Sequence, residues 1–256
     1  MILLFGGTSD AAEISERVAK LGYKVLVSTA TDVELNVGSH KLIKRQVGRI
    51  NLNEIKRLIT DRGIKMVIDA THPYAEIVRN NARTAAKACN VPYLTFMRPA
   101  QKYDYENIFW AETHKESAEI AFSSGKTVFT MTGSKDIATY AKQSKEKGVA
   151  LVARVLNHPQ SIESCRIAGI ASSHIVAGRG PFTVEQNLEQ IRAFKAGVIV
   201  TKDSGVAGGV LEKMEAAKQA GAIMVIVKRP QHDKSGSFET IKKLIEAFQK
   251  IIYTLP

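Results

Sequence analysis

The sequence of 256 residues contains only two cysteines, Cys89 and Cys165. They lie far apart and near no cluster of histidines, so neither a disulfide framework nor a Cys-x-x-Cys zinc site is expected. The sequence also lacks an apolar run of the roughly 18 to 20 residues that spans a bilayer, and its start, MILLF, lacks the basic segment and cleavage site of a secretory signal. We therefore expect a cytosolic protein with free thiols, no metal site and no membrane partner.

Concentrated charge is missing as well, although the formal net charge is +11. The 36 Lys and Arg residues are spread along the chain, without the basic arm or helix that most nucleic-acid-binding proteins carry. We therefore expect no nucleic-acid partner. The positive charge either serves solubility or attracts a small anionic substrate.

Three common catalytic motifs are absent. No Gly-x-Ser-x-Gly sequence marks a serine hydrolase, and no Tyr-x-x-x-Lys marks a tyrosine-dependent dehydrogenase. The tripeptide Gly125–Thr127 lacks the upstream glycine of a phosphate-binding P-loop and precedes an expected strand instead of a helix. Nucleophilic hydrolysis is therefore poorly supported, and the motifs of the P-loop and of the tyrosine-dependent dehydrogenases are missing.

What the sequence does contain is a regular alternation of short apolar runs with helical periodicity. The runs are nearly continuous and rich in β-branched residues, which is typical of parallel strands covered by helices on both faces. Ten runs are too many for one compact sheet at this length, so two sheets are expected. The expected strands are residues 2–5, 24–28, 65–70, 91–96, 107–111, 127–131, 149–155, 174–178, 197–201 and 223–227, and the expected helices begin near Asp10, Leu52, Tyr74, Thr113, Ser134, Thr183 and Gly209.

Two internal echoes favour a duplicated α/β unit. FGGTSDA at 5–11 resembles MTGSKDI at 131–137, and THPYAEIVRNN at 71–81 resembles RGPFTVEQNL at 179–188. The tetrapeptide Ser123–Lys126 interrupts the pattern near the middle of the chain. We therefore predict two Rossmann-like domains with mainly parallel sheets, residues 1–124 and residues 125–256.

Five polar, glycine-containing or hydroxyl-rich turns follow expected strands. Since ligands of open α/β sheets bind beyond the carboxyl ends of the strands, these turns are the candidate ligand site. Surface turns are polar for other reasons too, but five on one edge favour a ligand. The turns are 6–10, 69–75, 132–136, 178–182 and 201–205.

The first turn allows two interpretations. Gly6 and Gly7 stand between a strand and a helix, where bare backbone N–H groups and the helix dipole favour a phosphate. The alternative is a plain turn in which Thr8 or Ser9 caps the helix. The pattern lacks the Gly-x-Gly-x-x-Gly spacing of dinucleotide-binding proteins.

The end of the second expected strand bears on the choice of cofactor. An NAD site usually has an acidic residue there to bind the ribose 2′-hydroxyl, whereas this sequence has Ser28, Thr29 and Thr31. Hydroxyl groups tolerate a 2′-phosphate, so NADPH is favoured over NADH. Asp32 is close enough to keep NADH open.

With these turns, the sequence resembles the precorrin-6A reductase family of cobalamin biosynthesis, which includes the cobalt-precorrin-6A reductases. The resemblance covers essentially the whole chain in order. One departure is that the family commonly has Glu-Ala-Arg after the glycine turn, where this chain has Asp10-Ala11-Ala12. The matching segments are LLFGGTSDA, STAT, DATHPYA, TGSKD, RVL, GRGPFT, VTKDSG followed by Gly208-Gly209, EKMEAA and VKRP.

The resemblance implies two Rossmann-like domains that exchange a strand, with a reduced nicotinamide cofactor and a tetrapyrrole macrocycle in the cleft between them. It implies hydride transfer to a conjugated double bond of precorrin-6A or cobalt-precorrin-6A, followed by protonation, to give the corresponding precorrin-6B. A macrocycle with many acetate and propionate groups is an anion that a protein of charge +11 attracts.

Roles for individual residues follow from combining the turns with the resemblance. Hydride transfer needs no protein nucleophile, so the first domain is expected to hold the cofactor and the second the substrate. Lys202 and Asp203 are the catalytic candidates, which stabilise charge or relay a proton unless solvent does so. The cofactor-binding candidates are Gly6, Gly7, Thr8, Ser9, Ser28, Thr29, Thr71, His72 and Pro73, and the substrate-binding candidates are Thr132, Gly133, Ser134, Lys135, Arg179, Gly180, Pro181, Phe182 and Ser204.

Two other functions fit the same sequence. One is a non-catalytic sensor that binds a nucleotide in response to redox state, and the other is an NADP-dependent reductase of a different small anion. The sensor predicts no oxidation of reduced nicotinamide with any tetrapyrrole. The residues do not distinguish a cobalt-containing from a metal-free substrate, and they do not indicate the oligomeric state.

Overall fold

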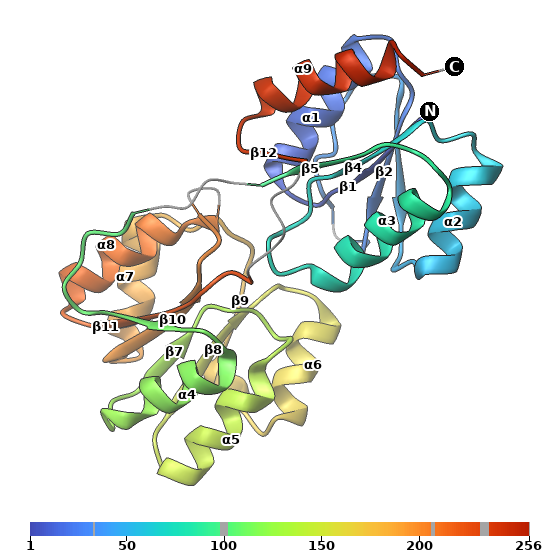
Figure 1. Ribbon diagram of the computed structural model, residues 1–256. Coiled ribbons are helices and arrows are strands. Elements are labelled where there is room, and N and C mark those ends of the chain that lie inside the picture. The colour runs from blue at the N-terminus through green and yellow to red at the C-terminus, as the bar shows by residue number, and fades with distance from the viewer. Residues whose placement is uncertain (33, 98–101, 206–207, 231–235, 256) are drawn as a thin grey trace. The chain divides into compact units, whose positions relative to one another are not determined.

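The computed structural model describes residues 1–32, 34–97, 102–205, 208–230 and 236–255. The chain forms two compact units, here called unit 1 (Met1–Pro99 with Gln231–Pro256) and unit 2 (Ala100–Pro230). Each unit contains one six-stranded sheet whose recorded strand pairs are all parallel (Figure 1). The predicted α/β class with two Rossmann-like sheets is confirmed.

The sheet of unit 1 has the strand order β12-β5-β4-β1-β2-β3. Helices α1 and α9 cover one face and α2 and α3 the other (Figure 1). Side chains of β1 alternate between the two cores, with Ile2 and Leu4 facing the first pair and Leu3 and Phe5 the second. The elements are β1 Ile2–Phe5, α1 Ser9–Lys20, β2 Val25–Thr29, β3 Ile43–Val47, α2 Leu52–Asp61, β4 Met66–Asp69, α3 Glu76–Ala88, β5 Tyr93–Phe96, β12 Ser237–Phe238 and α9 Ile241–Ile252.

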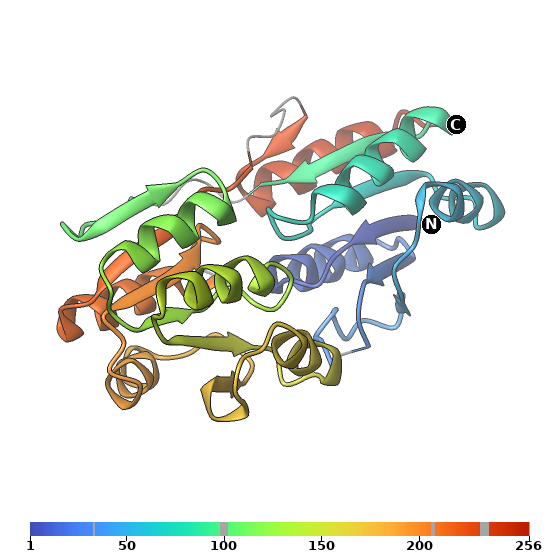
Figure 2. The same cartoon turned by 90° about the horizontal axis from the view of Figure 1, so that it is seen from below.

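The sheet of unit 2 has the order β6-β11-β10-β7-β8-β9. Helices α7 and α8 pack on one face, and α4, α5 and α6 lie on the other (Figure 1; Figure 2). The elements are β6 Ile108–Ala111, α4 His114–Ser123, β7 Val128–Thr130, α5 Ile137–Lys147, β8 Leu151–Val155, α6 Pro159–Ile167, the short 3-10 helix Ser172–His174, β9 Ile175–Ala177, α7 Val184–Ala193, β10 Val198–Lys202, α8 Val210–Ala220 and β11 Ile223–Val227.

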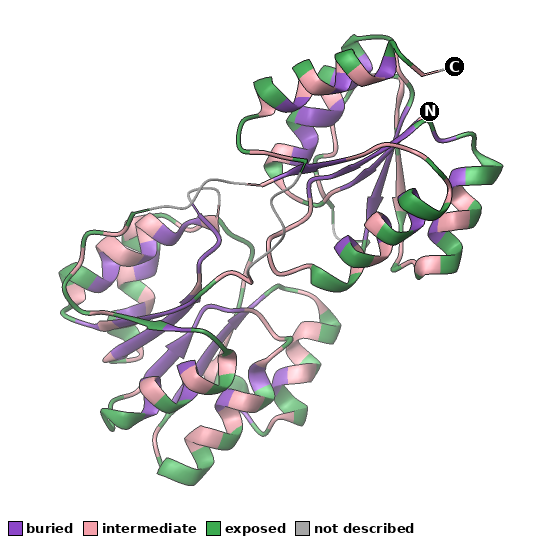
Figure 3. Cartoon of the chain, in the orientation of Figure 1, coloured by how far each residue is buried: buried purple, intermediate pink, exposed green. Residues whose placement is uncertain are grey.

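Burial explains why the strands read as unbroken apolar runs. In Figure 3 the central strands of both sheets are buried, while the outer faces of the helices are exposed. Every residue of β1, β2, β4, β7 and β8 is buried. A strand covered on both faces has no solvent side, so alternation with polar residues disappears.

The two sheets share one topology. The order β5-β4-β1-β2-β3 in unit 1 corresponds to β11-β10-β7-β8-β9 in unit 2, and each sheet adds one edge strand from elsewhere in the chain. β6 follows β5 in sequence but pairs with β11, and β12 follows β11 but pairs with β5. The two halves therefore exchange an edge strand, as the resemblance implied.

This exchange moves the division of the chain away from the expected boundary at residues 124 and 125. β6 and α4 precede that point yet belong to unit 2, and β12 and α9 follow it yet belong to unit 1. The chain therefore crosses between the sheets twice, whereas a single interruption of the sequence pattern predicts one crossing.

Candidate functional site

The predicted cofactor turns lie together at one edge of the first sheet. β1 pairs in parallel with β2 on one side and with β4 on the other, so Phe5 stands beside both Ser28 and Asp69. The chain order reverses between β1 and β4, which makes this the switch point where open α/β sheets bind ligands. The structure thus brings the turns after β1, β2 and β4 to one place.

The glycine turn combines close packing with an open face. A Cβ atom on Gly6 would lie 2.8 Å from the Cβ of Ala11, so glycine lets α1 approach β1. A Cβ on Gly7 would meet nothing within 4 Å, and the φ of +122° at Gly7 favours glycine. The backbone N–H groups of Gly7, Thr8 and Ser9 donate to no residue that the structure describes.

Thr8 caps helix α1 and also ties the glycine turn to its neighbour. Its Oγ1 accepts from the N–H of Ala11 at 3.2 Å and donates to the carbonyl oxygen of Ala70 at 3.2 Å. Ala70 lies in the turn after β4. Both interpretations of the first turn are therefore compatible with the structure, because capping uses the Thr8 side chain and leaves the exposed N–H groups to a ligand.

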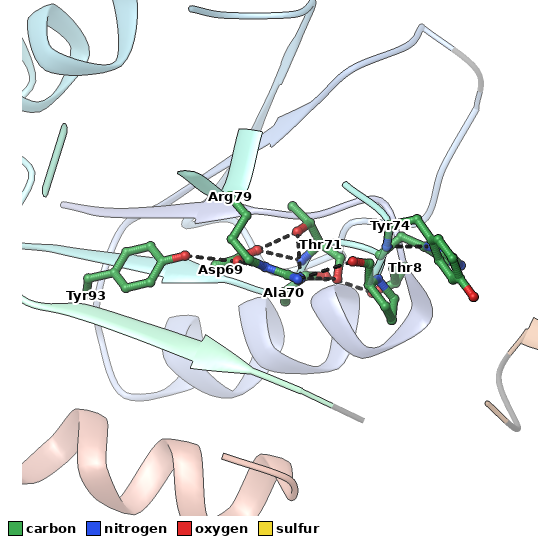
Figure 4. A network of polar contacts seen from close by, with 9 residues as sticks. Thr8, Asp69, Ala70, Thr71, Tyr74, Arg79 and Tyr93 are labelled. Atoms are coloured by element: carbon green, nitrogen blue, oxygen red, sulfur yellow. Dashed lines mark hydrogen bonds and ion pairs between the residues drawn. The ribbon is translucent and has the colours of Figure 1, made fainter. Parts of the chain in front are cut away.

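A buried ion pair, which no sequence argument identified, shapes the turn after β4 (Figure 4). Asp69 is 0% exposed and Arg79, on α3, is 3% exposed. Arg79 Nε donates to Asp69 Oδ2 at 2.7 Å, and the Tyr93 hydroxyl donates to the same oxygen at 2.9 Å. Burial, followed by the charge of Asp69, raises the pKa of Tyr93, so the phenol stays protonated and donates.

This pair holds the predicted cofactor residues of the loop. Asp69 Oδ1 accepts from both the N–H and the hydroxyl of Thr71, at 2.9 and 2.6 Å, and Arg79 Nη1 donates to the carbonyl oxygen of Pro73 at 3.3 Å. His72 Nδ1 accepts from the N–H of Tyr74 at 3.4 Å. The loop is thus positioned by side chains behind it.

At the end of β2 an arginine side chain is hydrogen-bonded to the hydroxyl group of Thr29, a predicted cofactor-binding residue. Ser28 and Thr29 are both buried, and Arg45 of the neighbouring strand β3 donates from Nε to Thr29 Oγ1 at 2.9 Å. Arg45 Nη2 also donates to the carbonyl oxygen of Thr31 at 2.7 Å. Sequence reasoning missed Arg45 because β3 was not expected.

These features fit a dinucleotide cofactor. The open face of Gly7 and the N–H groups beside it suit a pyrophosphate. Arg45 places a positive charge next to the strand end where the adenine ribose of a Rossmann ligand lies. The glycine turn would hold the pyrophosphate, and Thr29 with Arg45 would face the ribose.

Unit 2 repeats the switch point between β7 and β10. The turn after β7 contains Thr132–Asp136, and the turn after β10 begins at Asp203. Lys202 Nζ lies 3.3 Å from Asp136 Oδ2, and His114 Nε2 lies 3.1 Å from the same oxygen. Two of the predicted substrate turns are therefore joined by a Lys202–Asp136–His114 cluster.

His114 is neutral in this cluster. Burial, together with the nearby charges of Lys202 and Lys135, lowers its pKa to about 4, while Asp136 acts in the opposite direction. A neutral ring with its proton on Nε2 donates to Asp136 and leaves Nδ1 to the Tyr140 hydroxyl at 2.7 Å. Burial also lowers the pKa of Lys202, which Asp136 opposes.

Asp203, the second catalytic candidate, is engaged by other side chains. It is 7% exposed and accepts from Arg229 Nε at 2.7 Å and Nη2 at 3.1 Å, and from the Tyr103 hydroxyl at 2.6 Å. Ser204 is buried beside Gly208, where a Cβ atom would lie 1.8 Å from Ser204 Oγ. These contacts give Asp203 a part in holding the turn, and its role in proton transfer stays a prediction.

A pocket of about 170 Å³ opens at the carboxyl ends of β7, β8 and β9. Of the predicted substrate residues, Gly133, Gly180, Pro181 and Phe182 line it, while Thr132, Ser134, Lys135, Arg179 and Ser204 do not. Two buried cations that the sequence did not nominate also line it, Arg154 and Lys213. Arg154 stands in the matching segment RVL, a signal that was present but read as strand.

Two kinds of feature are absent from the ranges that the structure describes. No group of three or more His, Cys, Asp or Glu side chains within those ranges could hold a metal ion. No helix among the residues that the structure covers is both long and apolar enough to cross a membrane.

Comparison with known proteins agrees with this geometry. The precorrin-6x reductase CbiJ/CobK family model matches residues 1–249. The cobalt-precorrin-6A reductase of Priestia megaterium is 33% identical over 248 residues, covering 96% of this chain and 97% of that protein. The enzyme of the same name from Methanocaldococcus jannaschii is 35% identical over 248 residues, covering 96% of both.

A solved structure titled CobK precorrin-6A reductase has the same fold, with a TM-score of 0.80 and 22% identity over 97% of this chain and 96% of that one. The resemblance seen in the sequence motifs is confirmed. Since the family model and relatives above 30% identity match almost the whole chain, this protein belongs to the precorrin-6x reductase CbiJ/CobK family.

Proposed function

We propose that this protein reduces precorrin-6A, with or without cobalt, to the corresponding precorrin-6B. The observation that carries the proposal is similarity over 96% of the chain to proteins named cobalt-precorrin-6A reductase. The geometry agrees, because unit 1 offers an open glycine turn for a dinucleotide and unit 2 offers cations for an anionic ligand.

Unit 1 binds the cofactor in this proposal. The N–H groups of Gly7, Thr8 and Ser9 hold the pyrophosphate, and the Thr71–Pro73 loop lies beside the nicotinamide ribose. NADPH is the proposed cofactor, because Arg45 and Thr29 bring a cation and a hydroxyl group together at the end of β2. The reduced nicotinamide supplies the hydride when it is bound.

Unit 2 binds the macrocycle and stabilises the charge that develops on it in this proposal. Lys202 is largely buried and its ammonium group lies beside Asp136, so it presents a fixed positive charge at the switch point. Such a charge stabilises negative charge that develops on the ring as it accepts the hydride. Either Lys202 or solvent then supplies the proton.

The test is anaerobic incubation of the protein with precorrin-6A and with cobalt-precorrin-6A, each with NADPH and with NADH. We expect loss of the nicotinamide absorbance together with a product heavier by two hydrogen atoms. No oxidation of either cofactor with either macrocycle would overturn the proposal and favour the sensor function.

The role of Lys202 is tested in the same assay. Lys202→Ala should lower kcat or raise KM by about tenfold or more, because a preorganised charge is lost. Lys142→Ala is the matched control, since Lys142 is an exposed lysine on α5 whose side chain is 78% exposed. Unchanged kcat and KM in Lys202→Ala would show that solvent and other residues suffice.

A further inference from the structure

The pocket of unit 2 holds two cations without a carboxylate partner. Arg154 is 6% exposed and Lys213 is 9% exposed. No carboxylate within the described ranges lies within ion-pair distance of either side chain. Burying an unpaired charge is expensive, so the charge of Arg154, with the amine of Lys213 in the same pocket, indicates that an anion completes the site.

The bonds of Arg154 leave one edge of its guanidinium group available. Nη1 donates to Asn187 Oδ1 at 2.8 Å and to Gln190 Oε1 at 2.9 Å, and both acceptors come from α7. Nε and Nη2 have no partner among the described residues. These two nitrogens form the side-on fork that binds the two oxygens of a carboxylate.

The aromatic ring of Phe182 fixes the plane of this group. The Arg154 Cζ atom lies 4.0 Å from the ring centroid of Phe182. Glycine at position 178 leaves room for that ring, because a Cβ there would lie 2.9 Å from Phe182 Cζ. A stacked guanidinium with Nη1 already bonded has little freedom left to lose on binding.

Lys213 adds a second donor to the pocket. Its Nζ donates to the carbonyl oxygen of Gly208 at 2.9 Å and to Thr201 Oγ1 at 3.3 Å, which leaves the third proton of a protonated ammonium group for a ligand. Burial and the charge of Arg154 lower the pKa of Lys213 to about 7, with Glu212 acting in the opposite direction. An anion in the pocket would favour the charged form.

We propose that this pocket is a carboxylate subsite in which Arg154 binds one carboxylate side arm of the substrate through Nε and Nη2, and Lys213 supplies a further hydrogen bond. The inference deepens the proposed function and rests on it for the identity of the substrate. A volume of about 170 Å³ is too small for a macrocycle, since sites that enclose drug-sized ligands measure about 300–1,000 Å³. An acetate or propionate arm fits, so the subsite would set the orientation of the ring.

The pocket is tested first without turnover. Sodium propionate is added to the ¹⁵N-labelled full chain, with propionamide as the uncharged probe, and the Nε–H signal of Arg154 is assigned with the Arg154→Lys variant. We expect propionate to shift this signal and propionamide to leave it in place. An unshifted signal at saturating propionate would overturn the subsite.

Turnover then decides whether the substrate uses it. Arg154→Gln should raise KM for the macrocycle about 30-fold or more with a smaller change in kcat, because it removes a desolvated charge partner. Arg166→Gln is the control, an exposed arginine on α6 that forms an ion pair with Glu163. An unchanged KM in folded Arg154→Gln refutes the subsite, whereas an inactive wild-type protein refutes the proposed function and leaves the propionate result standing.

Discussion

Replacing Asp69 by Asn tests whether the buried ion pair holds the turn after β4. The carboxylate is 0% exposed and accepts four hydrogen bonds, one from Arg79, two from Thr71 and one from Tyr93. Asn keeps the shape but leaves the Arg79 charge buried without a partner. Breaking a buried pair in this way costs about 3–5 kcal/mol. Because Arg79 keeps its other bonds to the loop, we expect the free energy of unfolding to fall by about 3 kcal/mol.

The assay is urea unfolding followed by far-UV circular dichroism. With a slope of about 1–3 kcal/mol per M, the loss lowers the midpoint by about 1–3 M. The one tryptophan, Trp110, lies on β6 in unit 2, so its fluorescence follows the other unit in the same samples. Asp61→Asn, at an exposed position on α2, is the matched control.

The double variant Asp69→Asn with Arg79→Met separates the charge pair from the rest of the network. Removing both charges leaves no unpaired ion, so the double variant should be more stable than the sum of the single losses implies. A loss below about 1 kcal/mol in Asp69→Asn, or strict additivity in the double variant, would refute the reasoning.

Three further outcomes are expected. Gly208→Ala should lose about 1–3 kcal/mol in urea unfolding through overpacking against Ser204, and Ser204→Gly in the same chain should restore part of it. The pKa of His114 is about 4 in the folded protein, below its ordinary value of 6.5. The neutral ring therefore contributes at most about 3 kcal/mol of stability above pH 6.5, and this contribution is lost as the pH falls toward 4. In His114→Gln the free energy of unfolding should fall less steeply over this pH range. Arg45→Gln should raise KM for NADPH about tenfold and leave KM for NADH unchanged, and an equal effect on both cofactors would remove the 2′-phosphate role.

The sequence predicted best the strands that are buried on both faces of their sheet. All ten expected strands are present. The central strands are buried on both faces and keep an apolar sequence whatever packs on them, whereas the expected strands β6 and β9 are partly exposed. β3 was missed because it is an edge strand with Lys44, Arg45 and Gln46 in its middle, and β12 because it has only two residues. α6 buries only Cys165, so its pattern is faint.

α9 is a different case, because its sequence signal was present and overlooked. Leu244, Phe248 and Ile252 recur every four residues and are all buried, and Thr240 caps the helix by accepting from the N–H of Lys243. The sequence could not reveal on which sheet this helix packs. The packing of α9 against α1 and β5, together with the pairing of β12 with β5, shows that this helix covers the first sheet.

The sequence predicted which turns form the candidate site, but it did not predict which side chains hold those turns in place. Parallel strands end at one edge, so the residues after them converge whatever their identity. The groups that hold those turns come from distant positions, such as Tyr93 for Asp69 and Asn187 for Arg154. Arg154 itself lies in β8 among buried apolar neighbours, so its pattern indicated only a strand.

Strand order also decides which turns of the two units correspond. The first echo is sound, because 5–11 spans the end of β1 and 131–137 follows β7, which occupy equivalent places. The second echo pairs the turn after β4 with the turn after β9, whereas the counterpart of β4 is β10. The likeness of those two sequences is therefore not a product of the shared topology.

The true counterparts share chemistry instead of sequence. At the end of β4, Asp69 is bonded to an arginine and a tyrosine hydroxyl, and directly after β10, Asp203 is bonded to Arg229 and the Tyr103 hydroxyl. Both aspartates are buried beside the switch point of their sheet, where a turn must keep its shape while a ligand approaches it. This parallel supports a positioning role for Asp203 and leaves Lys202 as the residue of the pair better placed to act on charge in the substrate.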